Sequence, residues 1–281
     1  MNGTLNNYVW LVRRELWEHR AIWVVPAVIA GILVLLALFG KIHVFATDLP
    51  MDLRQQGAAI LAVIGGIFFV VLSVTVSLYY LDCLYDDRRD RSVLFWKSLP
   101  ISDTETVLSK FIVGAVVMPM VYYVISQLTA LTVAGITSVR SPDIARLFWQ
   151  SDIWWQLQVF WLYIMAVFTV WYLPLIGWSL LVSVTVKRAP LLWSVLPLLV
   201  VYLVEKFFLG NLYLSKIIGD RLAGFLGVVF NRNFRASTNQ NVWDLLNLKA
   251  FFTSMDMWLG LLVGVAFIIA TIELRKRRTE V

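Results

Sequence analysis

The segment with the clearest chemical potential is a run of acids and arginines that follows a long apolar stretch. Four aspartates and three arginines are interleaved in it: Asp82, Asp86, Asp87, Arg88, Arg89, Asp90 and Arg91. Carboxylates at such spacing could hold a magnesium ion that is bound to a diphosphate. The arginines would instead neutralise the acids, and Asp87 and Arg91 have the i, i+4 spacing of a helical ion pair. The segment therefore indicates either a metal site or a structured, charged surface.

Two helices are predicted to position this segment. Asp82, Asp86 and Asp90 recur every fourth residue, so the helix that begins in the preceding apolar stretch is predicted to continue through them. Pro100 then interrupts the chain, because the residue before a proline disfavours helix. Ser102 and Glu105 have the spacing of a capping box, which predicts that the next helix begins there.

A short apolar piece, residues 93–96, lies between the charged run and Pro100. Exposed apolar residues framed by charge usually mark a docking surface. We therefore expect residues 82–110 to form a compact, structured loop that docks onto a partner.

The composition of the whole chain indicates a membrane protein. Hydrophobic residues make up 60% of it and charged residues 15%, whereas soluble domains have about 45–50% and about 25%. We predict an all-α integral membrane protein, a single domain over residues 1–281, with six transmembrane helices. The apolar stretches that predict them are residues 21–40, 57–81, 111–137, 153–186, 189–204 and 257–272. The fourth is longer than a bilayer requires, and Pro174 is predicted to kink it.

Two further segments are predicted to lie at the membrane surface. Residues 7–20 mix tryptophans and leucines with charges and are expected to form an amphipathic interfacial helix. Residues 208–254 begin with a part that is too apolar for a free loop and too interrupted for a span. We expect an external segment here, with one or two short, partly embedded helices before the last span.

Basic residues predict the orientation of the chain. Lysines and arginines concentrate before the first apolar stretch, between the second and third, at Lys187 and Arg188, and after the last. The positive-inside rule therefore places both termini in the cytoplasm. The net charge of +6 is explained by this bias and by anionic lipid, and no nucleic-acid partner is expected.

The charged segment resembles the first cytoplasmic loop in the permease subunits of ATP-binding-cassette (ABC) exporters of the type-2 fold. That loop has an acidic and arginine-rich stretch, a short helix, a proline-containing turn near a serine, and a lysine opening the next span. Here these parts correspond to residues 86–91, 92–98 and 99–102 and to Lys110. The family commonly has a Gly-Thr-Leu-Glu-like run where residues 92–95 read Ser-Val-Leu-Phe. The amphipathic first helix, the six spans and the long external connection also match the family.

The resemblance implies a multi-pass subunit of a bacterial inner-membrane exporter, whose loop is a coupling helix seated in a separate ATPase subunit. Two ATPase subunits, a second copy or a related permease, and membrane lipid would be its partners. The chain has no G-x-x-x-x-G-K-[ST] phosphate loop, so ATP and Mg would bind the partner, with no cofactor, metal site or catalytic residue in this chain. The implied ATPase interface comprises Asp86, Asp87, Arg88, Arg89, Asp90, Arg91, Val93, Leu94, Phe95, Trp96 and Pro100.

Four aromatic residues in the fourth stretch are candidates for a substrate path that would suit a hydrophobic or amphipathic cargo. They are Trp161, Trp171, Tyr172 and Trp178. The central thirds of the spans contain no ionisable residue, which argues against a proton- or ion-coupled carrier.

Two other functions stay open. An intramembrane prenyltransferase-like enzyme with an Asp-rich motif would need a second such motif, where this chain has Lys187 and Arg188. A non-transporting assembly or sensor subunit is not excluded by any feature of the sequence.

Overall fold

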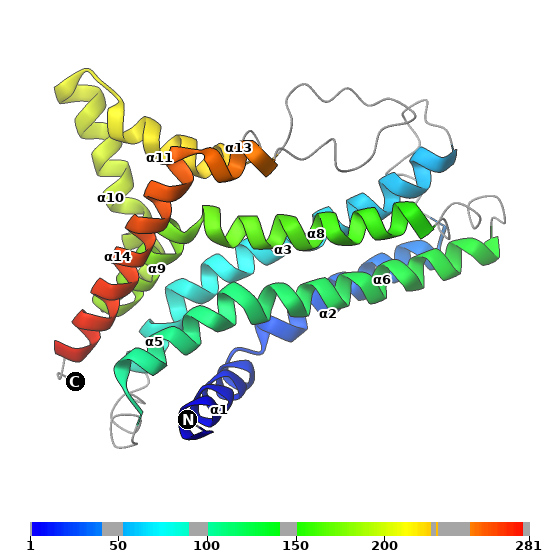
Figure 1. Ribbon diagram of the computed structural model, residues 1–281, viewed down its shortest axis with the longest axis horizontal. Coiled ribbons are helices and arrows are strands. Elements are labelled where there is room, and N and C mark those ends of the chain that lie inside the picture. Colours follow the sequence, from blue (N-terminus) through cyan, green and yellow to red (C-terminus); the bar gives the residue numbers. More distant parts are fainter. Residues whose placement is uncertain are drawn as a thin grey trace.

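The computed structural model describes residues 2–40, 53–89, 101–140, 151–225, 229 and 248–277. All regular structure within these ranges is helical, which confirms the predicted all-α class. Figure 1 shows most of the long helices gathered into one elongated bundle, with α10 diverging from it. The elements in chain order are α1 (Asn2–Glu18), α2 (Ala21–Leu38), α3 (Leu53–Arg89), α5 (Asp103–Ile112), the π-helical turn η2 (Val113–Val117), α6 (Met118–Arg140), α8 (Ser151–Trp171), α9 (Leu173–Thr185), α10 (Pro190–Val204), the π-helical turn η3 (Glu205–Leu209), α11 (Tyr213–Ala223), α13 (Leu248–Thr253) and α14 (Met255–Arg277).

Five uninterrupted helical segments in the described part of the chain are long and apolar enough to cross a membrane. They are Ala21–Leu38, Ile60–Arg89, Asp103–Arg140, Pro190–Leu209 and Met255–Arg277. Residues 154–185 form a sixth candidate, in which α8 and α9 meet at an angle of 56°. Pro174 lies in the first turn of α9, where its missing N–H leaves no helical hydrogen bond unmade. The break predicted near Pro174 is therefore confirmed.

The flanking predictions also correspond to helices. α1 covers residues 7–18 of the amphipathic segment predicted at residues 7–20, and α2 begins directly after that segment. α3 continues past the apolar stretch to Arg89, as the spacing of the aspartates indicated. α11 is a short helix inside the predicted external segment, and none of its residues is buried. Of that segment, residues 226–228 and 230–247 lie outside the described residues.

Small residues allow the closest helix packing in the bundle. α9 lies along α14 and α2 lies along α6 (Figure 1). A Cβ atom added to Gly177 would lie 2.8 Å from the carbonyl oxygen of Gly264, and one added to Gly264 would lie 2.7 Å from the backbone of Leu173. Since these distances are shorter than real contacts, α9 and α14 approach each other as only glycines permit.

α10 packs least of all the candidate spans. Only Pro190 and Ser194 are buried in it, while most of its leucines, its valines and Trp193 are exposed. In a bilayer, this apolar surface would face lipid or another protein.

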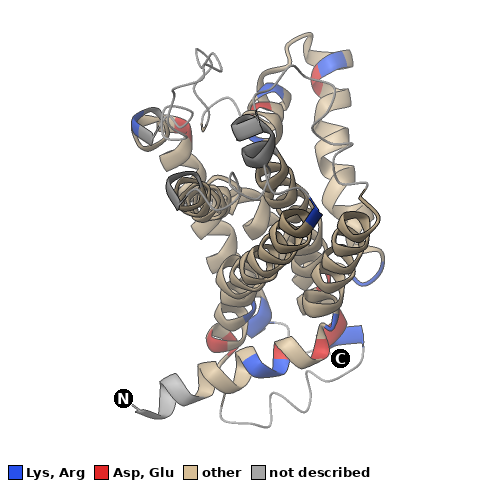
Figure 2. Ribbon diagram, turned by 90° about the vertical axis from the view of Figure 1, so that its right-hand side faces the viewer, with Lys and Arg blue, Asp and Glu red and all other residues tan. Residues whose placement is uncertain are grey.

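Charged residues concentrate at the ends of the helices. Figure 2 shows most Lys, Arg, Asp and Glu residues toward two opposite ends of the described bundle, with uncharged helix between them. We call the end at which Arg89 and Asp103 flank residues 90–100 the loop end. α1 and the last turn of α14 also lie there, because both form ion pairs with α3 and α5.

Candidate functional site

Four charged side chains from four helices meet in the interior at the loop end. These residues, which we call the ionic cluster, are Glu15 of α1, Asp87 of α3, Lys110 of α5 and Arg275 of α14. Their exposed fractions are 1%, 5%, 0% and 6%. Charged residues are almost never buried to this extent unless they are paired.

Lys110 and Asp87 form the centre of the ionic cluster. The Lys110 Nζ atom donates to Oε1 of Glu15 at 2.7 Å and to Oδ1 of Asp87 at 3.3 Å. The other oxygen of Asp87, Oδ2, accepts from Nη1 of Arg275 at 3.4 Å. The cluster contains two carboxylates and two cations, so its formal charge is zero. Because each charge has an opposite partner, the cost of burial is offset only while all four are present.

Polar groups around the cluster extend it toward the surface. The Tyr79 hydroxyl donates to Oε2 of Glu15 at 3.0 Å. Arg275 Nε donates to Asp103 at 3.0 Å, and Arg14 Nη2 donates to Asp87 at 3.1 Å. Burial alone would lower the pKa of Arg14, but its hydrogen bond to Glu18 and the neighbouring carboxylates raise that pKa above its ordinary value. Arg14 therefore remains charged.

The start of α5 follows from its sequence and places Lys110 correctly. Ser102 Oγ accepts from the backbone N–H of Glu105 at 3.1 Å, and the Glu105 carboxylate accepts from the N–H of Ser102 at 2.8 Å. This is the predicted capping box, and it is confirmed. Since the cap determines where the helix begins, it determines which face of α5 carries Lys110.

A second contact joins the end of α3 to the end of α9. Arg88 Nη2 donates to the carbonyl oxygens of Ser183 and Val186, each at 2.6 Å. In return, Ser183 Oγ accepts from the backbone N–H groups of Leu84 and Tyr85 at 3.1 and 3.0 Å. The last carbonyls of a helix lack partners within it, so a cation that binds them stabilises that end.

The structure separates the residues expected at the ATPase interface. Asp86 and Arg89 form a partly exposed pair at 3.3 Å. Asp87 is buried in the ionic cluster and Arg88 is directed to α9, so the expectation that Asp87 lies on an exposed docking surface needs correction. The physical reason is that Lys110 and Arg275 hold it inside. The remaining interface residues lie outside the described residues: Asp90, Arg91, Val93, Leu94, Phe95, Trp96 and Pro100.

Sequence reasoning missed the roles of Glu15 and Arg275. Glu15 belongs to a helix whose charges were interpreted as facing the membrane interface. Arg275 belongs to a basic run that was interpreted as an orientation signal. The position of Lys110 was one available signal. It lies at the start of a long apolar stretch, and a lysine buried there would require an acidic partner in the interior.

A groove runs beside α3 and is bordered by α8, α9, the start of α10 and the end of α11. Its volume is about 910 Å³, and none of its lining residues is charged. On α3 it extends from Gly66 to Leu81. A helix rises about 1.5 Å per residue, so this is about 22 Å, most of the roughly 30 Å thickness of a bilayer's hydrocarbon core.

Aromatic rings close the groove at the end away from the loop. Phe168 lies at the centre of this aromatic closure, with ring centroids 4.6 Å from Tyr172, 5.1 Å from Phe69 and 5.9 Å from Phe225. The Tyr172 hydroxyl donates to the carbonyl oxygen of Leu222 at 3.0 Å. The closure therefore joins α3, α8 and the segment that follows α11.

The four aromatic residues proposed for a substrate path do not share one location. Trp161 and Tyr172 line the groove. Trp171 is buried elsewhere, where its Nε1 donates to the carbonyl oxygen of Arg221 at 2.9 Å. Trp178 Nε1 donates to the carbonyl oxygen of Ser194 at 3.0 Å, between α9 and α10.

Comparison with known proteins does not assign this chain to a family. No family model, no curated protein and no solved structure matches it. The ionic cluster and the groove are therefore the features from which its function can be inferred.

Proposed function

We propose that this chain is the transmembrane subunit of an ABC exporter in a bacterial inner membrane. It would form the substrate path and couple to a separate ATPase subunit through residues 82–110. The observation that carries this proposal is the ionic cluster, which joins the two helices flanking residues 90–100 to α1 and α14.

A coupling loop has to pass a displacement to the spans. α3 and α5 lead into and out of residues 90–100, and their facing side chains Asp87 and Lys110 are paired in the interior. Separating a buried ion pair costs several kcal/mol. A push on the loop would therefore move α1, α3, α5 and α14 together rather than bend one helix.

The groove provides a path of suitable chemistry. Its uncharged lining with several aromatic rings favours an apolar or amphipathic cargo. The aromatic closure and α11 lie at its far end, where an outer gate would be required. Opening that gate would separate Tyr172 from Leu222 and Phe168 from Phe225.

The proposal assigns partners as well as an orientation. Two ATPase subunits would bind ATP and Mg and receive the loop at the cytoplasmic face, where both termini lie. A second copy or a related permease would complete the path, and the exposed apolar side of α10 is a surface that it could cover.

The Asp-rich enzyme is a weaker interpretation of the same segment. Both oxygens of Asp87 accept from cations, namely Lys110, Arg14 and Arg275. An acid held in this way is not available to bind magnesium, so Asp87 serves packing better than metal chemistry.

The proposal is tested by purifying the chain from its native membranes in mild detergent and identifying the proteins that accompany it. An ATPase with a phosphate-binding loop should co-purify with the wild type and be lost from the variant Phe95→Asp with Trp96→Asp. The matched control is Phe208→Asp, an exposed aromatic position in η3, which follows α10, and it should retain the ATPase. Absence of any ATPase from intact wild type, or its retention by the double variant, would contradict the proposal.

A further inference from the structure

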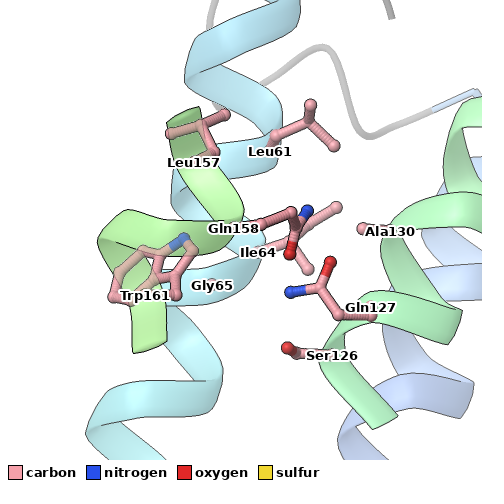
Figure 3. Close-up of a pocket in the computed structure, with 9 residues that line it drawn as sticks. All are labelled: Leu61, Ile64, Gly65, Ser126, Gln127, Ala130, Leu157, Gln158 and Trp161. Atoms are coloured by element: carbon pink, nitrogen blue, oxygen red, sulfur yellow. The ribbon is translucent and has the colours of Figure 1, made fainter. Parts of the chain in front are cut away.

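The wall of the groove between α3 and α8 is tightly packed. Figure 3 shows Trp161 of α8 beside Gly65 of α3, and a Cβ atom added to Gly65 would overlap the ring of Trp161. Trp161 also lines the groove. Since only a glycine leaves room for this indole, α3 and α8 lie too close together here for the groove to open between them easily.

A loosely packed helix covers the end of the groove that lies away from the loop end. Leu222 and Ala223 of α11, and Phe225 after it, line the groove there. None of the residues of α11 is buried, and Leu214, Ile217 and Leu222 are all more than half exposed. Burial of apolar area therefore contributes little to the position of α11, and polar contacts at its two ends have to hold it.

The first end of α11 is bound to the helical segment that precedes it. The carboxylate of Glu205 in η3 accepts from the backbone N–H groups of Leu214 at 2.6 Å and of Ser215 at 2.8 Å. The first N–H groups of a helix have no partner within it, so Glu205 provides a cap from outside α11. Gly210 makes the turn between the two segments at φ +65°, a conformation that favours glycine. This end of α11 is therefore fixed to η3.

The other end of α11 is bound to different helices through Arg221. Its guanidinium carbon lies 4.3 Å from the centre of the Trp171 ring, and its Nη1 donates to the carbonyl oxygen of Asp256 at 2.9 Å. The carbonyl oxygen of Arg221 accepts from Trp171 Nε1 at 2.9 Å. A Cβ atom added to Gly260 of α14 would overlap the guanidinium. Arg221 therefore lies between the last residue of α8 and the first turns of α14.

This position leaves one nitrogen of Arg221 unsatisfied. Nη2 is the atom that a Cβ on Gly260 would meet first, and it is buried without a hydrogen-bond partner among the described residues. A buried donor that has lost its hydrogen bonds to water costs free energy. The cost narrows the free-energy difference between this position and one in which water reaches the guanidinium.

We infer that α11 is a hinged lid over this end of the groove, with its hinge at Glu205 and Gly210 and its latch at Arg221. Release of Arg221 from Trp171 and Gly260 would tilt the end of α11 away from the bundle and remove part of the groove wall. The inference rests on the proposed function for the role of this lid as the outer gate. The hinge and the latch themselves are properties of this chain and need no ATPase.

Double electron–electron resonance on the full chain, in lipid nanodiscs that hold one chain each, tests the lid. One nitroxide is placed at Val159→Cys of α8, a position that is 43% exposed. The second is placed at Asp220→Cys to give the latch pair, or at Lys216→Cys to give the hinge pair, and both positions are exposed. Along α8, Val159 lies about 18 Å from Trp171 at about 1.5 Å per residue, a separation that suits the method. The native Cys83 is buried and stays unlabelled.

Two variants release the latch in different ways. Gly260→Ala fills the space of the guanidinium and leaves α11 unchanged, whereas Arg221→Gln removes the guanidinium without adding volume. Each should raise several-fold the fraction of chains in which the latch pair has a longer distance, while the hinge pair changes little. Gly219→Ala is the matched control, because its Cβ would meet nothing within 4 Å, and it should leave both pairs unchanged.

Two results would overturn the inference. A latch pair that stays unchanged in both Gly260→Ala and Arg221→Gln shows that Arg221 does not hold α11. Equal lengthening of the latch pair and the hinge pair shows that α11 detaches as a whole and has no hinge. Since the chain is measured without ATP and without a partner, neither result bears on the co-purification test of the proposed function.

Discussion

Replacing Lys110 with methionine removes the central cation of the ionic cluster while keeping a side chain of similar length. Glu15 would then be left 1% exposed, with the Tyr79 hydroxyl at 3.0 Å, His19 Nε2 at 3.6 Å and Arg14 Nη2 at 4.0 Å from its carboxylate. Asp87 would keep Arg14 and Arg275. The substitution therefore mainly affects Glu15, whose buried carboxylate loses its closest cation.

Removing one partner of a buried ion pair costs about 3–5 kcal/mol. For a chain of this size, each kcal/mol lowers the unfolding midpoint by about 2–4 °C. We therefore expect Lys110→Met to lower the midpoint by about 6–20 °C. The matched control is Lys187→Met, since Lys187 is exposed between α9 and α10, and it should change stability by less than about 0.5 kcal/mol.

Thermal unfolding in nanodiscs, followed by tryptophan fluorescence, measures these midpoints. The double variant Lys110→Met with Glu15→Gln removes both charges of the closest pair. Because it leaves no lone carboxylate at Glu15, it should be more stable than the sum of the two single losses predicts, by about 1–3 kcal/mol. If Lys110→Met behaves like Lys187→Met, or if the two losses simply add, the ionic cluster does not hold these helices together.

Three further substitutions test other contacts. Ser102→Ala removes the cap that Glu105 completes and should cost about 1 kcal/mol, with faster hydrogen exchange confined to the first turn of α5. Gly264→Ala should destabilise the α9–α14 pair by about 1–3 kcal/mol in thermal unfolding, whereas Gly135→Ala, whose Cβ would meet nothing within 4 Å, should not. Arg88→Met removes two hydrogen bonds to the end of α9 and should lower the free energy of unfolding by about 2–3 kcal/mol. It should also speed trypsin cleavage in the connection after α9, and unchanged cleavage would contradict the role of Arg88 in holding that end.

Features that depend on a few neighbouring residues were predictable from the sequence. The capping box at Ser102 and the break at Pro174 were both confirmed, because a cap and a proline act within one turn of the chain. The candidate spans follow from apolar length alone. Local rules therefore provided the helices and their ends.

The partners of Asp87 were not predictable in the same way. Asp87 has the spacing of a local ion pair with Arg91, yet it is paired with Lys110 and Arg275, which lie 23 and 188 residues away in sequence. Which face of a helix turns inward at the end of a span depends on the packing of all its neighbours. The groove has the same origin, since its walls come from α3, α8, α9, α10 and the end of α11.

The place of Arg275 in the chain has a consequence for biosynthesis. Arg275 lies in the last turn of α14 and binds Asp87 and Asp103 across 188 and 172 residues. Ribosomes make the chain from its N-terminus, so Glu15, Asp87 and Lys110 are all in place before Arg275 emerges. Until then the ionic cluster lacks one of its two cations, and Asp87 and Asp103 lack their hydrogen bonds from Arg275. A nascent or truncated chain that lacks this arginine would have an incomplete ionic cluster, which membrane proteases and chaperones could recognise. Insertion of α14 would complete the cluster and end that recognition.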